Sequence, residues 1–386
     1  MNDKTQLKNR DNLVDAIRGF ALLGIAMVNI HYFAQSSADG WFAAEFDSFA
    51  NQAGGFITSS FFLAKFYLLF SFLFGYSSTY LVKGSPENKK RWTKRSFALI
   101  GFGFIHAQFL FFGDILFIYG IFGLILWTFM FRRDAVIRGW AVFLYVLTAI
   151  GFFFVTVASF LADMFEPLSP EEFLTSTRLD QLMVNGNFLE QVLARTELWV
   201  TTLPGILILQ GPMVFVAFLL GLMAGRKSWL SKENFKATTA NKLMGFGFGF
   251  GIPLQMMAAI GMLWAFSGES FSLGVFMTSL AVIFLTGGLV SAGIVGAIGK
   301  LVLSGKKLEI LAGAGKHSLS IYLSQSLVFL VIYSGWGLGL FGETTLLTNL
   351  FMAFGVWFVL AVLATWNARS GRKGPMEALI SRSPRS

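Results

Sequence analysis

The chain has no cysteine, few charged residues and few histidines for its length. Among its 386 residues, 13% are charged and three are histidine. The absence of cysteine excludes disulfides, thiolate metal sites and a cysteine nucleophile. The charged fraction is about half that of a typical soluble domain. Because the three histidines are widely separated and carboxylates are scarce in the apolar segments, we expect no built-in metal site.

Motifs of common soluble enzyme classes are also missing. The chain contains no GxxxxGK[ST], HExxH or GxSxG motif, and no GxGxxG in a strand–helix context. The stretch "GFGFGFG" at 245–251 lies within an apolar run, so we interpret it as part of a glycine-rich helix rather than a phosphate-binding loop.

Long hydrophobic runs dominate what is present. The sequence is 55% hydrophobic, with 45 phenylalanines and a mean hydropathy of +0.65. Apolar runs of eighteen or more residues recur, which is typical of transmembrane helices. We therefore predict an all-α, polytopic integral membrane protein forming a single transmembrane domain, residues 1–386, with about ten transmembrane helices. The predicted spans are 13–34, 56–82, 93–112, 114–131, 137–161, 198–224, 240–266, 271–297, 317–335 and 346–368.

Basic residues are concentrated in alternate connections between these spans. Counting Arg18, 27 of the thirty basic residues belong to one set, which includes "KGSPENKKRWTKR" at 83–95 and both ends of the chain. The positive-inside rule places this set, and therefore both termini, in the cytoplasm. The net charge of +9 then reflects the orientation of the chain in the membrane. It predicts contact with membrane lipids in a bacterial cytoplasmic (inner) membrane and no binding of nucleic acid.

Two extramembrane features need separate interpretation. The N-terminal basic residues, apolar stretch and "SSADG" are reminiscent of a cleaved secretory signal. However, the first span carries Arg18, Asn29 and His31, so we interpret it as a retained helix. The segment 162–197 is predicted to be an extracytoplasmic loop with short amphipathic helices. In this segment "SPEEF" indicates a serine N-cap followed by proline at the first helical position.

Several titratable groups fall within the predicted spans, near their extracytoplasmic ends. The predicted catalytic residues are His106, Asp114 and Lys65. If the first four spans are neighbours, these groups share one outward-facing cavity with Asn29 and His31. Because an unpaired charge in hydrocarbon costs about 2.5–3.5 kcal/mol on insertion scales, such residues are functional candidates by default.

Each candidate also has a structural interpretation. Asp114 precedes an apolar run and is suited to cap the next helix, which does not exclude catalysis. Asn29 and His31 are compatible with headgroup depth. Lys65 can extend its ammonium toward the interface, although its neighbours are apolar over a long distance. An imidazole near a lysine and a carboxylate is also suited to proton transfer.

Other polar residues are weaker candidates for substrate binding. Arg18 lies three residues after Asp15, a spacing that permits an intrahelical ion pair. Glutamines near the middle of the bilayer most simply hydrogen-bond between helices. The substrate-binding set predicted from the sequence is Asn29, His31, Tyr119, Ser320, Tyr322, Gln325 and Arg18.

Four stretches carry a resemblance to a known family: "DAIRGFALLGIAMVNI" (15–30), "KFYLLFSFLFGYS" (65–77), "HAQFLFFGDILFIYGIFGLIL" (106–126) and "GKHSLSIYLSQS" (315–326). Together with the closing "GRKGPMEALISR" (371–382), they resemble the YeiB-like bacterial membrane proteins, which carry the domain of unknown function 418. That family is remotely similar to transmembrane acyltransferases, in one branch of which an arginine on the first helix precedes a histidine by eleven positions. Here Asn29 occupies that position after Arg18, and His31 lies two residues further on.

The resemblance implies transfer of an acyl group from a cytoplasmic acyl-CoA-type co-substrate to an extracytoplasmic sugar or lipid acceptor. No resident cofactor is expected. In this hypothesis His106, oriented by Asp114, acts as general base, and Lys65 or Asn29 stabilises the oxyanion. The alternative is a transporter, or a protein that binds lipid or small anions, using the same groups. The sequence shows no paired interrupted helices of the kind that mark transporter repeats.

Overall fold

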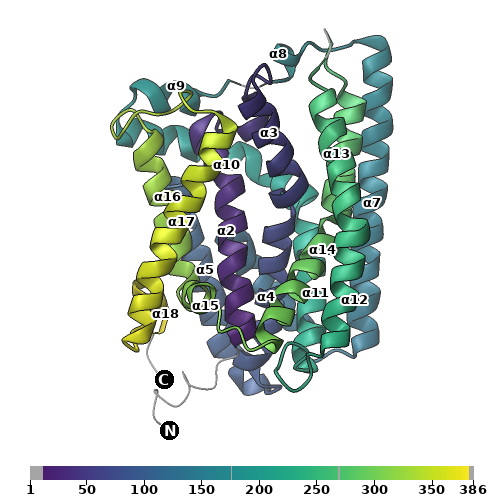
Figure 1. Cartoon of the computed structure of the whole chain (residues 1–386), viewed down its shortest axis with the longest axis vertical. Coiled ribbons are helices and arrows are strands. Elements are labelled where there is room, and N and C mark those ends of the chain that lie inside the picture. The colour runs from purple at the N-terminus through teal and green to yellow at the C-terminus, as the bar shows by residue number, and fades with distance from the viewer. Residues whose placement is uncertain (1–11, 175, 268–269, 382–386) are drawn as a thin grey trace.

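The computed structural model describes residues 12–174, 176–267 and 270–381, and within these ranges every regular element is helical (Figure 1). The elements in chain order are α2 (Asn12–Ala34), η1 (Gly40–Ala43), α3 (Phe49–Ile57), η2 (Thr58–Phe62), α4 (Lys65–Val82), η3 (Pro86–Asn88), α5 (Lys89–Phe109), α6 (Leu116–Leu126), η4 (Trp127–Phe129), α7 (Asp134–Phe165), α8 (Pro170–Phe173), α9 (Arg178–Asn185), α10 (Phe188–Leu209), α11 (Gly211–Arg226), α12 (Ala237–Phe246), η5 (Gly247–Gly251), α13 (Ile252–Trp264), α14 (Leu273–Leu303), α15 (Glu309–Lys316), α16 (Ser318–Tyr333), α17 (Leu346–Arg369) and α18 (Pro375–Ser381).

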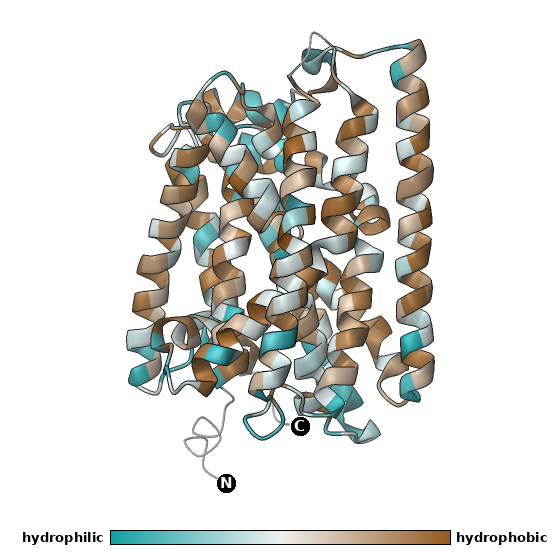
Figure 2. Cartoon of the chain, turned by 45° about the vertical axis from the view of Figure 1, so that its right-hand side comes forward, coloured by the Kyte–Doolittle hydropathy of each residue, from teal (hydrophilic) through white to brown (hydrophobic). Residues whose placement is uncertain are grey.

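The lengths and composition of these helices fit a polytopic membrane protein. Seven helices in the described ranges are long and apolar enough to cross a membrane, and three shorter apolar helices accompany them. Figure 2 shows hydrophobic residues along the shafts of the helices and hydrophilic residues gathered toward their ends. The predicted all-α membrane fold is confirmed. The end of the bundle that carries residues 83–95, 226–236 and 300–316 is called the basic face below, and the other end is called the opposite face.

Helix α2 occupies the middle of the bundle, where it packs against α4, α15, α16 and α17 (Figure 1). Close packing against α15 depends on small residues in both helices. A Cβ atom on Gly19 would clash with the backbone of Leu311, and one on Gly315 would clash with the backbone of Asp15. Interfaces between membrane helices use small residues in this way because they gain dispersion contacts as the backbones approach.

Two of the predicted spans are interrupted, which corrects the sequence-based prediction. The predicted span 56–82 divides at Leu63–Ala64, where Ala64 has a left-handed backbone with φ of 68°. The predicted span 198–224 consists of two helices, α10 and α11, which meet at Gln210. The half-helices α4 and α11 then pack side by side, with Gly75, Gly221 and Gly225 at their contact.

The segment 162–197 contains the predicted short capped helices α8 and α9, but its last ten residues, 188–197, belong to α10, a 22-residue helix long enough to cross a membrane. Ser169 accepts a hydrogen bond from the Glu172 backbone and begins α8, with proline at the first helical position. Equivalent capping boxes begin α9 at Thr177 and α10 at Asn187. These reciprocal bonds satisfy backbone donors that the start of a helix would otherwise leave free.

Candidate functional site

His106 and Asp114 meet where α5 ends and α6 begins. The chain leaves α5 at Phe109 and turns back into α6 at Leu116. Gly103 permits the close approach of these two helices, because a Cβ atom at that position would lie 2.5 Å from Asp114 Oδ1 and 2.7 Å from Phe117 Cα. The two polar residues are thereby brought to one point, although they are eight positions apart in the sequence.

The Asp114 carboxylate makes two different hydrogen bonds. Its Oδ1 atom accepts from the Phe117 backbone N–H at 2.7 Å, which caps the start of α6. Its Oδ2 atom lies 2.7 Å from Nδ1 of His106. The structural and functional interpretations of Asp114 are therefore compatible, since one oxygen serves each.

The hydrogen bond to Asp114 determines which nitrogen of His106 is available for chemistry. His106 is 1% exposed and Asp114 is 4% exposed. An ionised carboxylate only accepts hydrogen bonds, so Nδ1 of His106 carries the proton that is donated to Asp114. Nε2 of His106 has no hydrogen-bond partner among the described residues. With Nδ1 protonated, neutral His106 presents a lone pair at Nε2, as a general base requires.

Two tyrosines form the wall beside this pair. The ring of Tyr322 on α16 lies 4.9 Å from the ring of His106, centre to centre, and its buried hydroxyl has no hydrogen-bond partner among the described residues. Tyr119 on α6 is held by Ser71, whose Oγ lies 2.6 Å from the Tyr119 hydroxyl. Tyr119 and Tyr322 both also line the large cavity described next.

A cavity of about 2380 Å³ extends from the basic face into the bundle. Its lining includes Ile115, Leu116, Tyr119 and Tyr322, which neighbour the His106–Asp114 pair, although neither member of the pair is itself a lining residue. Its charged lining is strongly basic, with eleven cationic residues and four acidic ones. The cationic residues are Arg18, Lys83, Lys90, Arg91, Lys94, Arg95, Lys232, Lys306, Lys307, Lys316 and Lys373. Such a surface attracts anionic ligands.

Arg18 contributes a charge to the cavity wall from α2. Its guanidinium pairs with Asp15 at 3.1 Å and contacts the Ser77 hydroxyl. The intrahelical pair predicted from the spacing of Asp15 and Arg18 is confirmed. Arg18 lies on the cavity side of α2 and is separate from the cluster around His31.

Ser320 is engaged by the C-terminal segment. Its Oγ atom donates to Glu377 Oε2 at 2.5 Å. Glu377 Oε1 accepts from the backbone N–H groups of Leu319 and Ser320, at 2.8 and 3.2 Å. Gly374 leaves room for this contact, since a Cβ atom there would lie 2.7 Å from Ser320 Oγ. The "GPMEALISR" signature therefore attaches α18 to the start of α16, and Ser320 is part of that attachment.

Lys65 lies at the helix break and does not join His106. Its ammonium is fully buried and donates to the Ser59 carbonyl at 2.6 Å. Within the described part of the chain, Lys65 makes no ion pair with Asp114. The structure therefore places the predicted catalytic lysine in a different cluster, at the junction of η2, α4 and α14.

The remaining predicted residues also lie apart from His106. His31 is fully buried, and its Nε2 atom lies 3.1 Å from the Thr58 hydroxyl. Asn29 is half-buried on α2. Gln325 is buried on α16 with its Nε2 atom unpartnered among the described residues. The structure therefore does not gather the predicted residues in one outward-facing cavity. His106 and Asp114 form a pair beside the basic cavity, whereas Lys65 and His31 lie in a separate cluster near the helix break.

Sequence reasoning missed two residues that the structure brings into view. Glu377 lies in the quoted C-terminal signature, yet its role as the cap of α16 requires knowledge of which helix it meets. Arg195 was assigned to the extracytoplasmic segment, but it is 2% exposed and its Nη1 atom donates to the carbonyls of Gln108 and Phe109. Its position eight residues after the N-cap Asn187 would have placed it within a helix.

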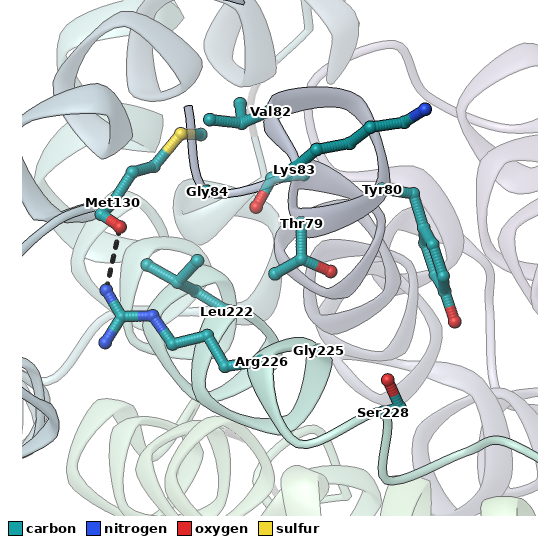
Figure 3. Close-up of a pocket in the computed structure, with 11 residues that line it drawn as sticks. Thr79, Tyr80, Val82, Lys83, Gly84, Met130, Leu222, Gly225, Arg226 and Ser228 are labelled. Atoms are coloured by element: carbon teal, nitrogen blue, oxygen red, sulfur yellow. Dashed lines mark hydrogen bonds between the residues drawn. The ribbon is translucent and has the colours of Figure 1, made fainter. Parts of the chain in front are cut away.

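A smaller cavity of about 320 Å³ opens at the basic face between α4 and α11. Figure 3 shows Arg226 directed toward the Met130 carbonyl, with the Lys83 side chain extending away from it. Arg226 also pairs with Asp134 at 2.6 Å. Because this arginine already has a counterion and carbonyl acceptors, it ties helix ends together and is a poor candidate for ligand binding.

Comparison with known proteins finds similarity to a family and to two proteins that are themselves uncharacterised. Residues 224–383 match the family described as "Protein of unknown function (DUF418)". The chain is 24% identical over 407 residues to the uncharacterised protein YxaH of Bacillus subtilis, covering 97% of this chain and 94% of YxaH. It is 31% identical over 140 residues to the uncharacterised protein YeiB of Escherichia coli, covering 33% of this chain and 32% of YeiB. No solved structure matches the chain. The chain thus resembles the DUF418 family over residues 224–383 and is similar along almost its whole length to YxaH.

Proposed function

We propose that the protein is an acyltransferase of the bacterial cytoplasmic membrane that uses His106 as general base. The observation that carries this proposal is that the His106–Asp114 pair lies next to Ile115 and Tyr322, which line a strongly basic cavity. An acyl-CoA-type donor has phosphates that the cationic vestibule would attract and a long flexible arm that suits a deep cavity. The positive-inside rule assigns the vestibule to the cytoplasm, where such donors are made.

The proposed reaction is a direct transfer. His106 Nε2 takes the proton from an acceptor hydroxyl, and the acceptor oxygen forms a bond to the carbonyl carbon of the thioester. The carbon–sulfur bond then breaks, and the leaving thiolate takes up the proton from His106. Asp114 keeps the imidazole in the required tautomer and stabilises its protonated form.

The structure changes which residue we assign to the oxyanion. Lys65 donates to the Ser59 carbonyl, so it is not available at the reaction centre. Tyr322 belongs to the residues that line the cavity, its ring lies 4.9 Å from the His106 ring, and its buried hydroxyl has no hydrogen-bond partner among the described residues. We therefore assign Tyr322 as the hydrogen-bond donor to the developing negative charge. The acceptor would be a sugar or lipid hydroxyl that approaches from the opposite face.

The test is binding and turnover of radiolabelled acetyl-CoA and a long-chain acyl-CoA by purified protein in nanodiscs. We expect saturable binding that weakens with salt, and release of the acyl group to water or an added acceptor. His106→Gln should retain binding and lower the rate of release by about 10²–10⁴-fold, the range typical of general-base catalysis. His31→Gln is the matched control, since it replaces another buried histidine outside this cavity. Absence of saturable binding by folded protein would refute the proposal.

Transport is the second candidate, and the interrupted helices favour it. Transporters place substrate sites where membrane helices break, and here α3–α4 and α10–α11 are both interrupted. The half-helices α4 and α11 pack together, with buried Lys65 at the start of α4. Uptake of a labelled anion into proteoliposomes that is abolished by Lys65→Met and retained by His106→Gln would favour transport over acyl transfer.

A further inference from the structure

The seam between α5 and α10 contains a buried cation without a buried counterion. Arg195 is 2% exposed, and its hydrogen bonds run from Nη1 to the carbonyls of Gln108 and Phe109, at 3.2 and 3.1 Å. Within the described residues, no carboxylate lies within ion-pair distance of Arg195. A buried charge without an ionic partner is costly, and two carbonyl dipoles compensate for only part of that cost.

A second unsatisfied group lies on the same seam. Both polar atoms of the Gln108 side chain are buried and lack a partner in the described part of the chain. Phe104, one turn before Gln108, contacts Trp199, one turn after Arg195, with ring centres 5.8 Å apart. Because residues four apart share a helix face, Gln108 and Arg195 occupy facing positions one turn along the same contact.

The surroundings of this pair indicate what kind of ligand can reach it. Phe104 and Phe109 on α5 are 49% and 45% exposed, and Leu193 on α10 is 57% exposed. In a membrane such side chains face hydrocarbon, and neither Arg195 nor Gln108 is among the residues that line the basic cavity. Arg195 on α10 contacts the last residues of α5, at the end away from the basic face, and the ends of membrane-spanning helices lie close to the lipid phosphates.

We propose that the α5–α10 seam binds the phosphodiester of an anionic phospholipid from the leaflet at the opposite face. Arg195 supplies the positive charge, and the Gln108 amide supplies a neutral donor. Arginine suits this role because its guanidinium can donate two hydrogen bonds to a phosphate while its other N–H groups still donate to protein carbonyls. The acyl chains of the lipid would lie against Phe104, Phe109 and Leu193. This inference does not depend on acyl transfer.

The experiment measures lipid binding by native mass spectrometry of the whole chain released from nanodiscs. The nanodiscs contain either phosphatidylglycerol or phosphatidylcholine. We expect the wild type to retain phosphatidylglycerol preferentially and Arg195→Gln to lose about tenfold or more of that preference. The matched control is Arg178→Gln, which removes an arginine from the same segment whose side chain is 62% exposed. An unchanged preference in Arg195→Gln would overturn the proposal.

A second variant keeps the test decisive if Arg195→Gln does not fold. Gln108→Leu leaves both backbone carbonyls available to Arg195, and it should weaken phosphatidylglycerol retention several-fold in a folded protein. Equal retention by Gln108→Leu and the wild type would refute the two-donor site. Inorganic phosphate in detergent distinguishes the sources of the anion. Saturable phosphate binding that displaces the lipid would show a free-anion site and overturn the lipid assignment.

Discussion

Gly103→Ala should separate His106 from Asp114 without altering either residue. A Cβ atom at this position would lie 2.5 Å from Asp114 Oδ1 and 2.7 Å from Phe117 Cα. Since carbon atoms prefer separations of about 3.5–4.0 Å, the start of α6 must retreat by roughly 1 Å. Asp114 and Phe117 move together with that start, so the 2.7 Å hydrogen bond from His106 on α5 to Asp114 would lengthen. Overpacking of this kind costs about 1–3 kcal/mol of stability.

The same helix provides a matched control. A Cβ atom on Gly101 would meet nothing within 4 Å, so Gly101→Ala should gain roughly 1 kcal/mol from helix propensity. Thermal unfolding in one detergent should therefore place Gly101→Ala at or above the wild type and Gly103→Ala below it. If acyl release is detected, Gly103→Ala should lower it about a hundredfold, the effect of a 1 Å misplacement at a reacting centre. Equal Tm values for the two variants would refute the packing argument.

The remaining predictions concern the helix ends at the basic face and the contact between half-helices. Glu377→Gln should weaken the attachment of α18 and speed cleavage near residue 374 in limited proteolysis, whereas Glu171→Gln, an exposed control, should not. Arg369 lowers the pKa of Glu309 through a hydrogen bond at 2.5 Å. The stability that this pair contributes is present above the ordinary carboxyl pKa and is lost as pH falls through the lowered value, so the Tm difference between wild type and Glu309→Gln should vanish in acid. Gly221→Leu should lower Tm by pressing on Phe72 of α4, whereas Gly139→Leu, in open space, should leave Tm within a degree or two.

Hydropathy and charge predicted most of the helices, because both follow from transferring side chains into hydrocarbon. They failed at Leu63–Ala64, where neither glycine nor proline marks the break. Alanine pays a penalty of about 1–2 kcal/mol for a left-handed backbone, so the surrounding packing must impose this conformation. The second break, at Gln210, did have a signal in the following Gly-Pro, which ends many helices.

The candidate site was predictable only where it is local in sequence. His106 lies near the end of α5, and Asp114 lies in the short connection that leads into α6. Their contact therefore follows from the tightness of that connection. Lys65 was grouped with them on the assumption that equal depth implies a shared cavity. Depth in the membrane does not determine, however, which side of the bundle a residue faces. The break at Ala64 directs the Lys65 ammonium toward Ser59. The partner of Ser320 lies 57 positions away in Glu377, a separation that no local pattern specifies.

Lys65 and Arg195, the two buried Lys or Arg side chains among the described residues, differ in a way that bears on function. Lys65 satisfies its ammonium with a carbonyl from its own interrupted helix, six residues earlier, so its bond stabilises the break itself. Arg195 instead donates to carbonyls of another helix, 86 and 87 residues away, and its fork geometry provides further N–H groups for a ligand. Neutralising Lys65 should therefore affect the shape of the α3–α4 break, whereas neutralising Arg195 should affect what the α5–α10 seam holds. We expect Lys65→Met to lose stability equally in phosphatidylglycerol and in phosphatidylcholine. We expect Arg195→Gln to lose stability only in phosphatidylglycerol. This pair of results would show that the Lys65 charge is structural and that the Arg195 charge binds lipid.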